Sequence, residues 1–257
     1  MEKRNQREKE SGSADLMLFG IHPVMEAIES GKEIDRLFIQ RNLSNPMMSE
    51  LKKLLRRNDI RSIEVPIEKL NRLTRSNHQG VVAFTTEVVY QKVSDVIPGL
   101  FEKGSDPLVV LLDRITDVRN FGAICRSAEC FGAGAVIVPE RGGAPANGDA
   151  MKASAGAMSR ITVCREHNLK EVIDYLRDSG FQVIGCSEKA SKNIFEFDLR
   201  GPLCIIMGSE EDGISPEYMK RCNHLVRIPM KGKVSSLNVS VAAGLALYEV
   251  TRQQLMS

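Results

Sequence analysis

Short, continuous apolar segments recur through the C-terminal part of the chain, and each is followed by a polar or glycine-rich loop. Three of them are residues 107–112 (PLVVLL), 135–139 (AVIVP) and 202–207 (PLCIIM). Runs without an alternation of polar and apolar residues are typical of parallel strands that are buried on both faces. The amphipathic stretch 168–180 between two of these runs indicates a helix. The sequence therefore predicts an α/β fold with a parallel sheet, in a domain that begins near Pro107 and ends at residue 257.

A second, smaller α/β domain is predicted over residues 17–91. The elements expected in it are a strand near residue 17, a helix after residue 23, a strand at 37–39, a helix at 49–60, a strand at 61–66, a helix at 67–77 and a strand at 80–90. Residues 92–106 contain a proline and two glycines and are expected to be a linker. Residues 1–16 lack the apolar segment of a signal peptide or membrane anchor and are expected to be a disordered tail.

The composition argues against several classes of protein. The formal net charge of +2 is close to neutral, so global charge does not require a nucleic-acid partner. The six cysteines form no CxxC pair and lie mostly in apolar runs, which indicates buried, reduced thiols in a cytoplasmic protein. The four histidines show no metal-ligand spacing, and we expect no metal. A Gly-x-Gly at 132–134 precedes a strand instead of following one, which disfavours an NAD-dependent reductase.

Basic residues are concentrated in the smaller domain between Arg36 and Arg75. They include Lys52, Lys53, Arg56, Arg57, Arg61, Lys69 and Arg72. Such a local excess is suited to the phosphate backbone of a nucleic acid, where each contact adds salt-dependent affinity. On charge alone, however, a solvated helix face is the favoured interpretation.

The loop that follows the first apolar run carries polar residues where open α/β sheets bind ligands. This loop begins at Asp113, and the candidates within and after it are Asp117, Asn120 and Arg126. Arg126 lies in an otherwise apolar helical segment and needs a partner. A phosphate or carboxylate of a ligand fits, and so does a structural salt bridge to Asp113, Asp117 or Glu210; the residues leave both alternatives open.

Two further loops have polar or glycine residues at comparable places. Gly208 follows the run 202–207 and lets the backbone approach a ligand, and Glu210 comes directly after it. Near the C terminus, Ser235, Ser236 and Asn238 precede an alanine-rich helical run. Their side chains can cap this helix, and its free amides suit an oxygen-rich or anionic ligand. An ordinary capped helix is the alternative.

Together and in this order, the three loops resemble the motifs of the SpoU (TrmH-like) family of RNA 2′-O-ribose methyltransferases. The pattern DxxxDxxNxGAIxRSA matches from Asp113 to Ala128, and GxExxG matches at 208–213. The segment NHQGVVAF at 77–84 resembles the RNA-binding domain, related in fold to a ribosomal protein, of the bacterial members that act on ribosomal RNA and some transfer RNAs. The resemblance covers nearly everything after Met17.

The resemblance implies a trefoil-knotted, SPOUT-type catalytic domain in which the segment from about residue 228 threads through a loop. It also implies S-adenosylmethionine as the cofactor and a homodimer formed through the C-terminal domain. The residues expected to hold the cofactor are Met207, Gly208, Ile228, Met230 and Leu237. The residues expected to act in catalysis are Arg126, Asn120, Glu210, Ser236 and Asn238.

Three functions are compatible with these motifs. The first is methylation of a guanosine ribose in 23S ribosomal RNA, favoured by the small domain that precedes the catalytic one. The second is the same reaction on transfer RNA. The third is an RNA-binding or ribosome-assembly factor without catalysis, which the intact catalytic motif residues argue against. The sequence does not identify the nucleotide.

Overall fold

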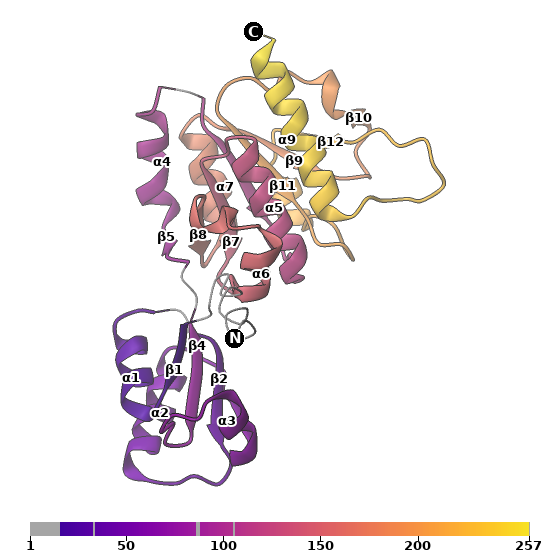
Figure 1. The fold of residues 1–257 in the computed structure, drawn as a ribbon. Coiled ribbons are helices and arrows are strands. Elements are labelled where there is room, and N and C mark those ends of the chain that lie inside the picture. The colour runs from indigo at the N-terminus through magenta and orange to yellow at the C-terminus, as the bar shows by residue number, and fades with distance from the viewer. Residues whose placement is uncertain (1–15, 33, 86–87, 105, 257) are drawn as a thin grey trace, which may run out of the picture. The chain divides into compact units, whose positions relative to one another are not determined.

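The computed structural model describes residues 16–32, 34–85, 88–104 and 106–256, which form two compact units (Figure 1). Along the chain, the main boundary between the units lies between Val89 and Tyr90, and the short segment Ala146–Gly148 is grouped with the first unit. Both units combine strands and helices, so the predicted α/β fold class is confirmed. The expected tail 1–16 lies outside the described residues except for Leu16, which begins the first strand.

The described residues of the first unit form a four-stranded sheet in the order β1-β4-β2-β3. Its elements are β1 (Leu16–Phe19), α1 (Ile21–Glu29), β2 (Ile34–Gln40), α2 (Pro46–Arg57), β3 (Ile63–Val65), α3 (Ile67–Leu73) and β4 (Val81–Thr85). Strand β4 is antiparallel to β1 and β2, and β3 is parallel to β2. Helices α1 and α2 share one apolar cluster with β2 and β4, while α3 packs with Phe38 and Val82 in another. Alternating strand residues therefore bury both faces of this sheet.

Helix α2 begins earlier than the apolar pattern predicts. The Asn45 side chain accepts a hydrogen bond from the Met48 backbone N–H at 2.7 Å, and Pro46 occupies the first turn. An N-terminal proline is favourable there because its missing N–H would have no partner within the helix. The cap and the proline together fix the start of α2 at Pro46.

The segment NHQGVVAF forms the turn into β4 and the strand itself. His78 is buried, and its ring makes contacts on both sides. The Gly80 N–H donates to Nδ1 at 3.0 Å, and Nε2 lies 2.9 Å from Asn71 Oδ1. Because Nδ1 accepts, Nε2 carries the proton and donates. His78 therefore holds this turn together within the first unit.

The described residues of the second unit form an eight-stranded parallel sheet in the order β10-β12-β9-β11-β6-β7-β8-β5. Its strands are β5 (Tyr90–Gln91), β6 (Leu108–Leu112), β7 (Ala135–Pro139), β8 (Thr162–Glu166), β9 (Gln182–Cys186), β10 (Lys192–Asn193), β11 (Leu203–Met207) and β12 (His224–Arg227). Its α-helices are α4 (Val93–Phe101), α5 (Val118–Cys130), α6 (Gly148–Ala153), α7 (Leu169–Asp178), α8 (Pro216–Met219) and α9 (Val239–Leu255), with 3-10 turns at Ala157–Ser159 and Ile194–Glu196.

Two predictions near the boundary between the units need correction. The strand expected at 80–90 is divided, because β4 ends at Thr85 and β5 joins the second sheet. The expected linker 92–106 contains helix α4, four of whose apolar side chains are between 2 and 9% exposed. These are Val93, Val96, Ile97 and Leu100. Their helical spacing places them on one face, and burial of this face outweighs the proline and glycine inside the segment.

Helices cover both faces of the second sheet. Val109 and Leu111 of β6 belong to an apolar cluster with α4 and α7. The residues that alternate with them, Val110 and Leu112, therefore point to the other face. Helices α5 and α9 contact β7 and β11 and lie side by side (Figure 1). Within the described ranges, every helix is too short or too polar to cross a membrane.

The six cysteines are all free thiols, but their environments differ. Cys125, Cys164 and Cys204 are buried, as expected, whereas Cys186 and Cys222 are partly exposed. The expectation of burial is wrong for Cys130, which is exposed at the last residue of α5. The apolar residues of this run predict a buried face of α5, but Cys130, the last residue of the helix, lies on the solvent-exposed side.

The three buried thiols should resist alkylation in the native protein. Burial disfavours the thiolate and raises the pKa of Cys164 to about 12; it raises the pKa of Cys125 and Cys204 as well. Because the pKa is raised, increasing the pH to about 9 should leave these thiols protonated and unreactive. Mass spectrometry after iodoacetamide treatment should show them unmodified until urea unfolds the chain. Rapid native labelling of Cys125 or Cys204 would contradict the packing described above.

Candidate active site

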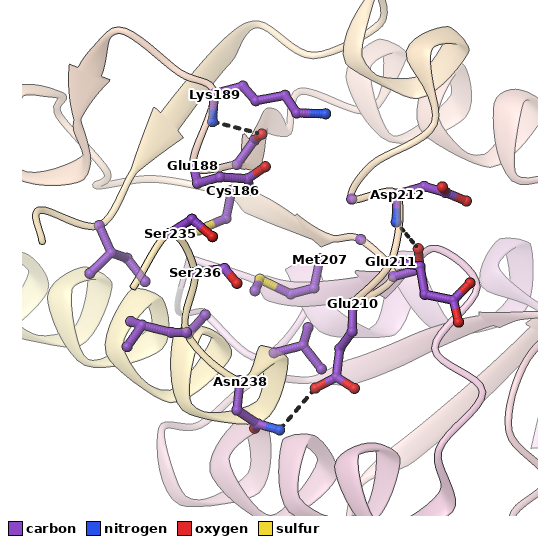
Figure 2. A pocket seen from close by; sticks show the side chains of 18 of the residues that line it. Cys186, Glu188, Lys189, Met207, Glu210, Glu211, Asp212, Ser235, Ser236 and Asn238 are labelled. Carbon is purple, nitrogen blue, oxygen red and sulfur yellow. Dashed lines mark hydrogen bonds between the residues drawn. The ribbon is translucent and has the colours of Figure 1, made fainter. Parts of the chain in front are cut away.

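A cavity of about 560 Å³ lies where β9, β11 and β12 end (Figure 2). Three segments that are far apart in the sequence line it: residues 186–189, residues 207–213 and parts of 228–242. The three strands are parallel neighbours, so their carboxyl ends meet at one edge of the sheet. This is the edge at which open α/β sheets bind ligands. The threading of the last segment through a knot stays a prediction.

The residues predicted to hold a cofactor all line this cavity. They are Met207, Gly208, Ile228, Met230 and Leu237. Glu210, Ser236 and Asn238, which were predicted to act in catalysis, line it as well. The structure thus brings these predicted residues to one place, and what each does toward a ligand stays a prediction.

The loop after β11 is a tight turn that requires glycine at position 208. Ser209 and Gly213 exchange backbone hydrogen bonds of 3.1 and 3.0 Å. A Cβ atom added at Gly208 would overlap the backbone of Gly213 and Ile214. Since backbone atoms at both ends of the turn are fixed, a larger residue has no room. Gly208 therefore sets the position of Glu210 at the cavity wall.

The cavity has an excess of negative charge. The carboxylates of Glu188, Glu210, Glu211 and Asp212 and the ammonium of Lys189 contribute to its lining (Figure 2). One of these carboxylates, that of Asp212, accepts a hydrogen bond from Arg114 at 3.1 Å. The remaining charge favours a ligand with a positively charged centre.

Asn238 caps the helix that closes the cavity. Its Oδ1 accepts hydrogen bonds from the backbone N–H groups of Ser240 at 3.0 Å and Val241 at 3.4 Å. The sequence offered Ser235 and Ser236 as further caps, but they lie before the helix, and their side chains have no hydrogen-bond partner among the described residues. Their hydroxyl groups are thus available to a ligand in the cavity.

The amide of Asn238 also joins two other predicted residues. Its Nδ2 donates to Asn120 Oδ1 at 3.0 Å and to Glu210 Oε1 at 2.9 Å, the latter shown in Figure 2. Asn120 lies in the first turn of α5, where the Asp117 carboxylate caps the backbone N–H groups of Arg119 and Asn120. One residue from each of the three motif loops is therefore connected in a single hydrogen-bonded group.

A second cavity of about 320 Å³ adjoins the first. Asn120, Asp117 and Thr116 line it, together with residues 209–212 and Val239, which also line the first cavity. Glu210 thus faces both spaces. Two adjoining cavities can hold two reactants side by side, which is the arrangement that a group-transfer reaction needs.

Asp113 joins the first motif loop to the second. Asp113 is 1% exposed, and its carboxylate accepts hydrogen bonds from Arg114, from the Ser215 backbone N–H at 2.6 Å and from the Ser215 hydroxyl at 2.7 Å. The hydrogen bond to Asp113 is the largest cause that raises the pKa of Arg114. Arg114 in turn donates to Asp212 and to the Gly213 carbonyl. A buried carboxylate with this many partners holds both loops in fixed positions.

Arg126 lies on α5 and is exposed. It makes no hydrogen bond or ion pair with any described residue, and it lines neither cavity. The structural salt bridge that the sequence left open is therefore wrong, because Asp113 pairs with Arg114, Asp117 caps α5 and Glu210 accepts from Asn238. Contact of its guanidinium with a ligand stays a prediction.

Sequence analysis missed two contributions to the site. The first is the loop 186–189 after β9, which lines the large cavity. In open α/β sheets, ligand sites are formed by the loops that follow buried parallel strands. Residues 181–186 are a mainly apolar run like those of the other strands, so the loop after them could have been predicted as part of the site. The second is Ser240, whose Oγ donates to Asn238 Oδ1 at 2.6 Å. A serine in the first turn of a helix carries no distinctive signal.

Two protein families match the two parts of the chain. The family described as "SpoU rRNA Methylase family" matches residues 107–248, and the one described as "RNA 2'-O ribose methyltransferase substrate binding" matches residues 17–91.

Similarities to individual proteins agree with these two family matches. The chain is 35% identical to the uncharacterized tRNA/rRNA methyltransferase slr0955 of Synechocystis sp. over 93% of its own length but 62% of that protein, less than two thirds. It is also 35% identical to 23S rRNA (guanosine-2'-O-)-methyltransferase RlmB of Vibrio parahaemolyticus, over 93% of this chain and 97% of that one. Among solved structures, it resembles the SpoU methyltransferase AviRb of Streptomyces viridochromogenes in complex with AdoMet, with a TM-score of 0.60, 29% identity and coverage of 94 and 91%.

Proposed function

Because the chain belongs to the SpoU rRNA methylase family, we propose that it methylates the ribose 2′-hydroxyl of a guanosine in 23S ribosomal RNA. The coarser activity follows from the family: the protein is an RNA 2′-O-ribose methyltransferase that uses S-adenosylmethionine. The finer assignment is supported by one observation, the 35% identity to the Vibrio 23S rRNA guanosine enzyme across 93% of the chain.

The large cavity fits S-adenosylmethionine. Its volume of about 560 Å³ is within the usual range for small-molecule sites. The unpaired hydroxyl groups of Ser235 and Ser236 can bind polar groups of this molecule. The carboxylates that line the cavity suit the positive charge on its sulfur. Backbone atoms at Met207, Gly208 and Ile228 complete the proposed contacts.

When bound, S-adenosylmethionine supplies a methyl group on a positively charged sulfur, which a ribose oxygen can take in one displacement without a metal. The protein then has to position two reactants and assist the loss of one proton. We assign the second cavity to the acceptor ribose, because Asn120 and Glu210 there provide a hydrogen-bond donor and an acceptor. Ser236 and Asn238 line the large cavity, in which we propose that the methyl donor binds.

We assign Arg126 to the acceptor as well. A guanidinium carries only N–H donors and is a poor proton acceptor near neutral pH. Its proposed task is therefore to orient the 2′-oxygen and stabilise the negative charge that develops on it, with the proton leaving to phosphate or water. Because Arg126 lines neither cavity, this role requires its exposed side chain to turn toward the ribose when RNA binds. Its exposed position without a partner supports contact with a large ligand such as RNA.

The substrate and the assembly are parts of the same proposal. The substrate-binding family match over 17–91 and the exposed basic residues of α2 and α3 support RNA contact by the first unit. Val241, Leu245 and Tyr248 are 51, 44 and 55% exposed at helical spacing on α9, which supports a homodimer through this helix. We propose the cytoplasm as the location of the enzyme, because its proposed RNA substrate is there.

Transfer RNA is the second candidate substrate, because slr0955 of Synechocystis is named for both RNA types. A methyl-transfer assay distinguishes the candidates. The purified chain should transfer tritiated methyl groups from S-adenosylmethionine to unmodified 23S ribosomal RNA, and a reverse-transcription stop should map the product to a guanosine.

Each other outcome of this assay has a clear meaning. Label found only in transfer RNA would replace the 23S assignment with the second candidate. Binding of S-adenosylmethionine without transfer to either RNA would favour a factor that has lost catalysis. Unfractionated RNA from cells that lack the gene is the appropriate substrate pool, since its target nucleotide is not yet methylated.

A further inference from the structure

The hydroxyl of Ser240 contacts the centre of the hydrogen-bonded group that connects the three motif loops. Its Oγ lies 2.6 Å from Asn238 Oδ1, which is the shortest of the three hydrogen bonds that this oxygen accepts. Ser240 lies in the first turn of α9 and lines neither cavity. Any effect it has on the reaction must therefore pass through Asn238.

The orientation of the Asn238 amide follows from the chemistry of its neighbours. The Ser240 and Val241 N–H groups can only donate, so the atom that faces them must be the oxygen. The Asn238 NH₂ group then has to face the opposite way, toward Asn120 and Glu210. A flipped amide would place two donors against the helix N–H groups.

The orientation of Asn120 follows in the same way. Because an N–H of Asn238 points at it, the atom of Asn120 that receives this bond must be Oδ1. The NH₂ group of Asn120 is left without a partner among the described residues, and Asn120 lines the second cavity. Asn120 thus has a hydrogen-bond donor to offer where the acceptor ribose is proposed to lie.

We propose that Ser240 is a positioning residue: through Asn238 it fixes the direction of the Asn120 amide, so that the acceptor cavity receives a hydrogen-bond donor for the ribose oxygen. This inference rests on the proposed function. Without the hydroxyl, Asn238 keeps its two backbone contacts but loses its shortest one. The Asn120 donor is then held less firmly while the reaction proceeds, and turnover falls.

The test is a kinetic comparison of the full-length wild type with three variants, using S-adenosylmethionine and the RNA that the wild type methylates. Ser240→Ala should lower kcat about five- to tenfold, the usual effect of one neutral hydrogen bond, with the KM for S-adenosylmethionine nearly unchanged. Ser240→Thr keeps a hydroxyl and should restore most of the loss. Thr251→Ala removes a hydroxyl from the same helix, one that donates to the Leu247 carbonyl, and should match the wild type.

A double-mutant cycle shows whether the effect passes through Asn120. In an Asn120→Ala background, Ser240→Ala should cause no further loss, because the group it positions is already gone. Single-turnover measurements at high enzyme concentration keep the slow variants measurable.

Four results would overturn the proposal: kcat of Ser240→Ala within twofold of the wild type, a threonine variant as slow as alanine, a rise in KM for S-adenosylmethionine without a fall in kcat, or equal losses in both backgrounds. Failure of the proposed function is a different observation, since the wild type itself would then methylate no RNA.

Discussion

Replacing Arg126 with alanine is expected to lower methyl transfer by about a thousandfold, while the affinity for S-adenosylmethionine changes by no more than a few fold. The first effect follows from loss of the group proposed to stabilise the developing negative charge on the ribose oxygen. The second follows from geometry, because Arg126 does not line the large cavity. Single-turnover transfer and calorimetry with S-adenosylmethionine measure the two quantities separately.

Arg119→Ala is the matched control for this experiment. It removes the same charge from the same helix, and the Arg119 side chain is exposed as well. Because Arg126 has no ion pair with any described residue, its replacement should leave the melting temperature unchanged. Equal losses of activity in the two variants, or loss of cofactor binding in Arg126→Ala, would contradict the assigned role.

Gly208→Ala is expected to abolish binding of S-adenosylmethionine, and methyl transfer with it. The added methyl group has to displace the backbone of Ile214 and of Gly213, which exchanges two hydrogen bonds with Ser209 in the same turn. Opening this turn moves Glu210 and the adjoining cavity wall. Calorimetry should show no heat of binding at concentrations that saturate the wild type.

Gly232→Ala provides the control for the second prediction. Gly232 lies in the segment between β12 and α9, and an added Cβ meets no atom within 4 Å. This variant should bind S-adenosylmethionine like the wild type. Circular dichroism of Gly208→Ala should retain the helix signal, which separates local distortion from unfolding. Normal cofactor affinity in Gly208→Ala would show that the turn tolerates a side chain.

The fold was predictable where burial alone decides the structure. The apolar runs that form β6, β7 and β11 are buried on both faces. Such strands need apolar residues at nearly every position, so the sequence alone identifies them. Helix α4 was missed because proline and glycine were given more weight than the spacing of four apolar residues. The exposed Cys130 shows a similar limit, since composition does not tell which side of a helix the last residue occupies.

The site was predictable to the level of its loops, because parallel strands bring their carboxyl ends to one edge. The motif residues Gly208, Glu210 and Asn238 therefore lie together in the structure. The partners of these residues were not predictable. Nothing in the sequence tells that Asp113 binds Ser215 instead of Arg126, or that Ser240 contacts Asn238, because these contacts depend on how loops far apart in the chain meet.

The order in which the cavity walls are synthesised has a consequence for the newly made protein. Residues 186–189 and 207–213 leave the ribosome before the segment from Ile228 to Val239, which supplies the final wall. As long as this segment is still inside the ribosome, the nascent chain has only two of the three segments that line the cavity. Uptake of a methyl donor in this cavity therefore has to wait until the segment up to Val239 has been translated, and a chain truncated shortly before α9 is expected to be inactive even if its sheet has formed.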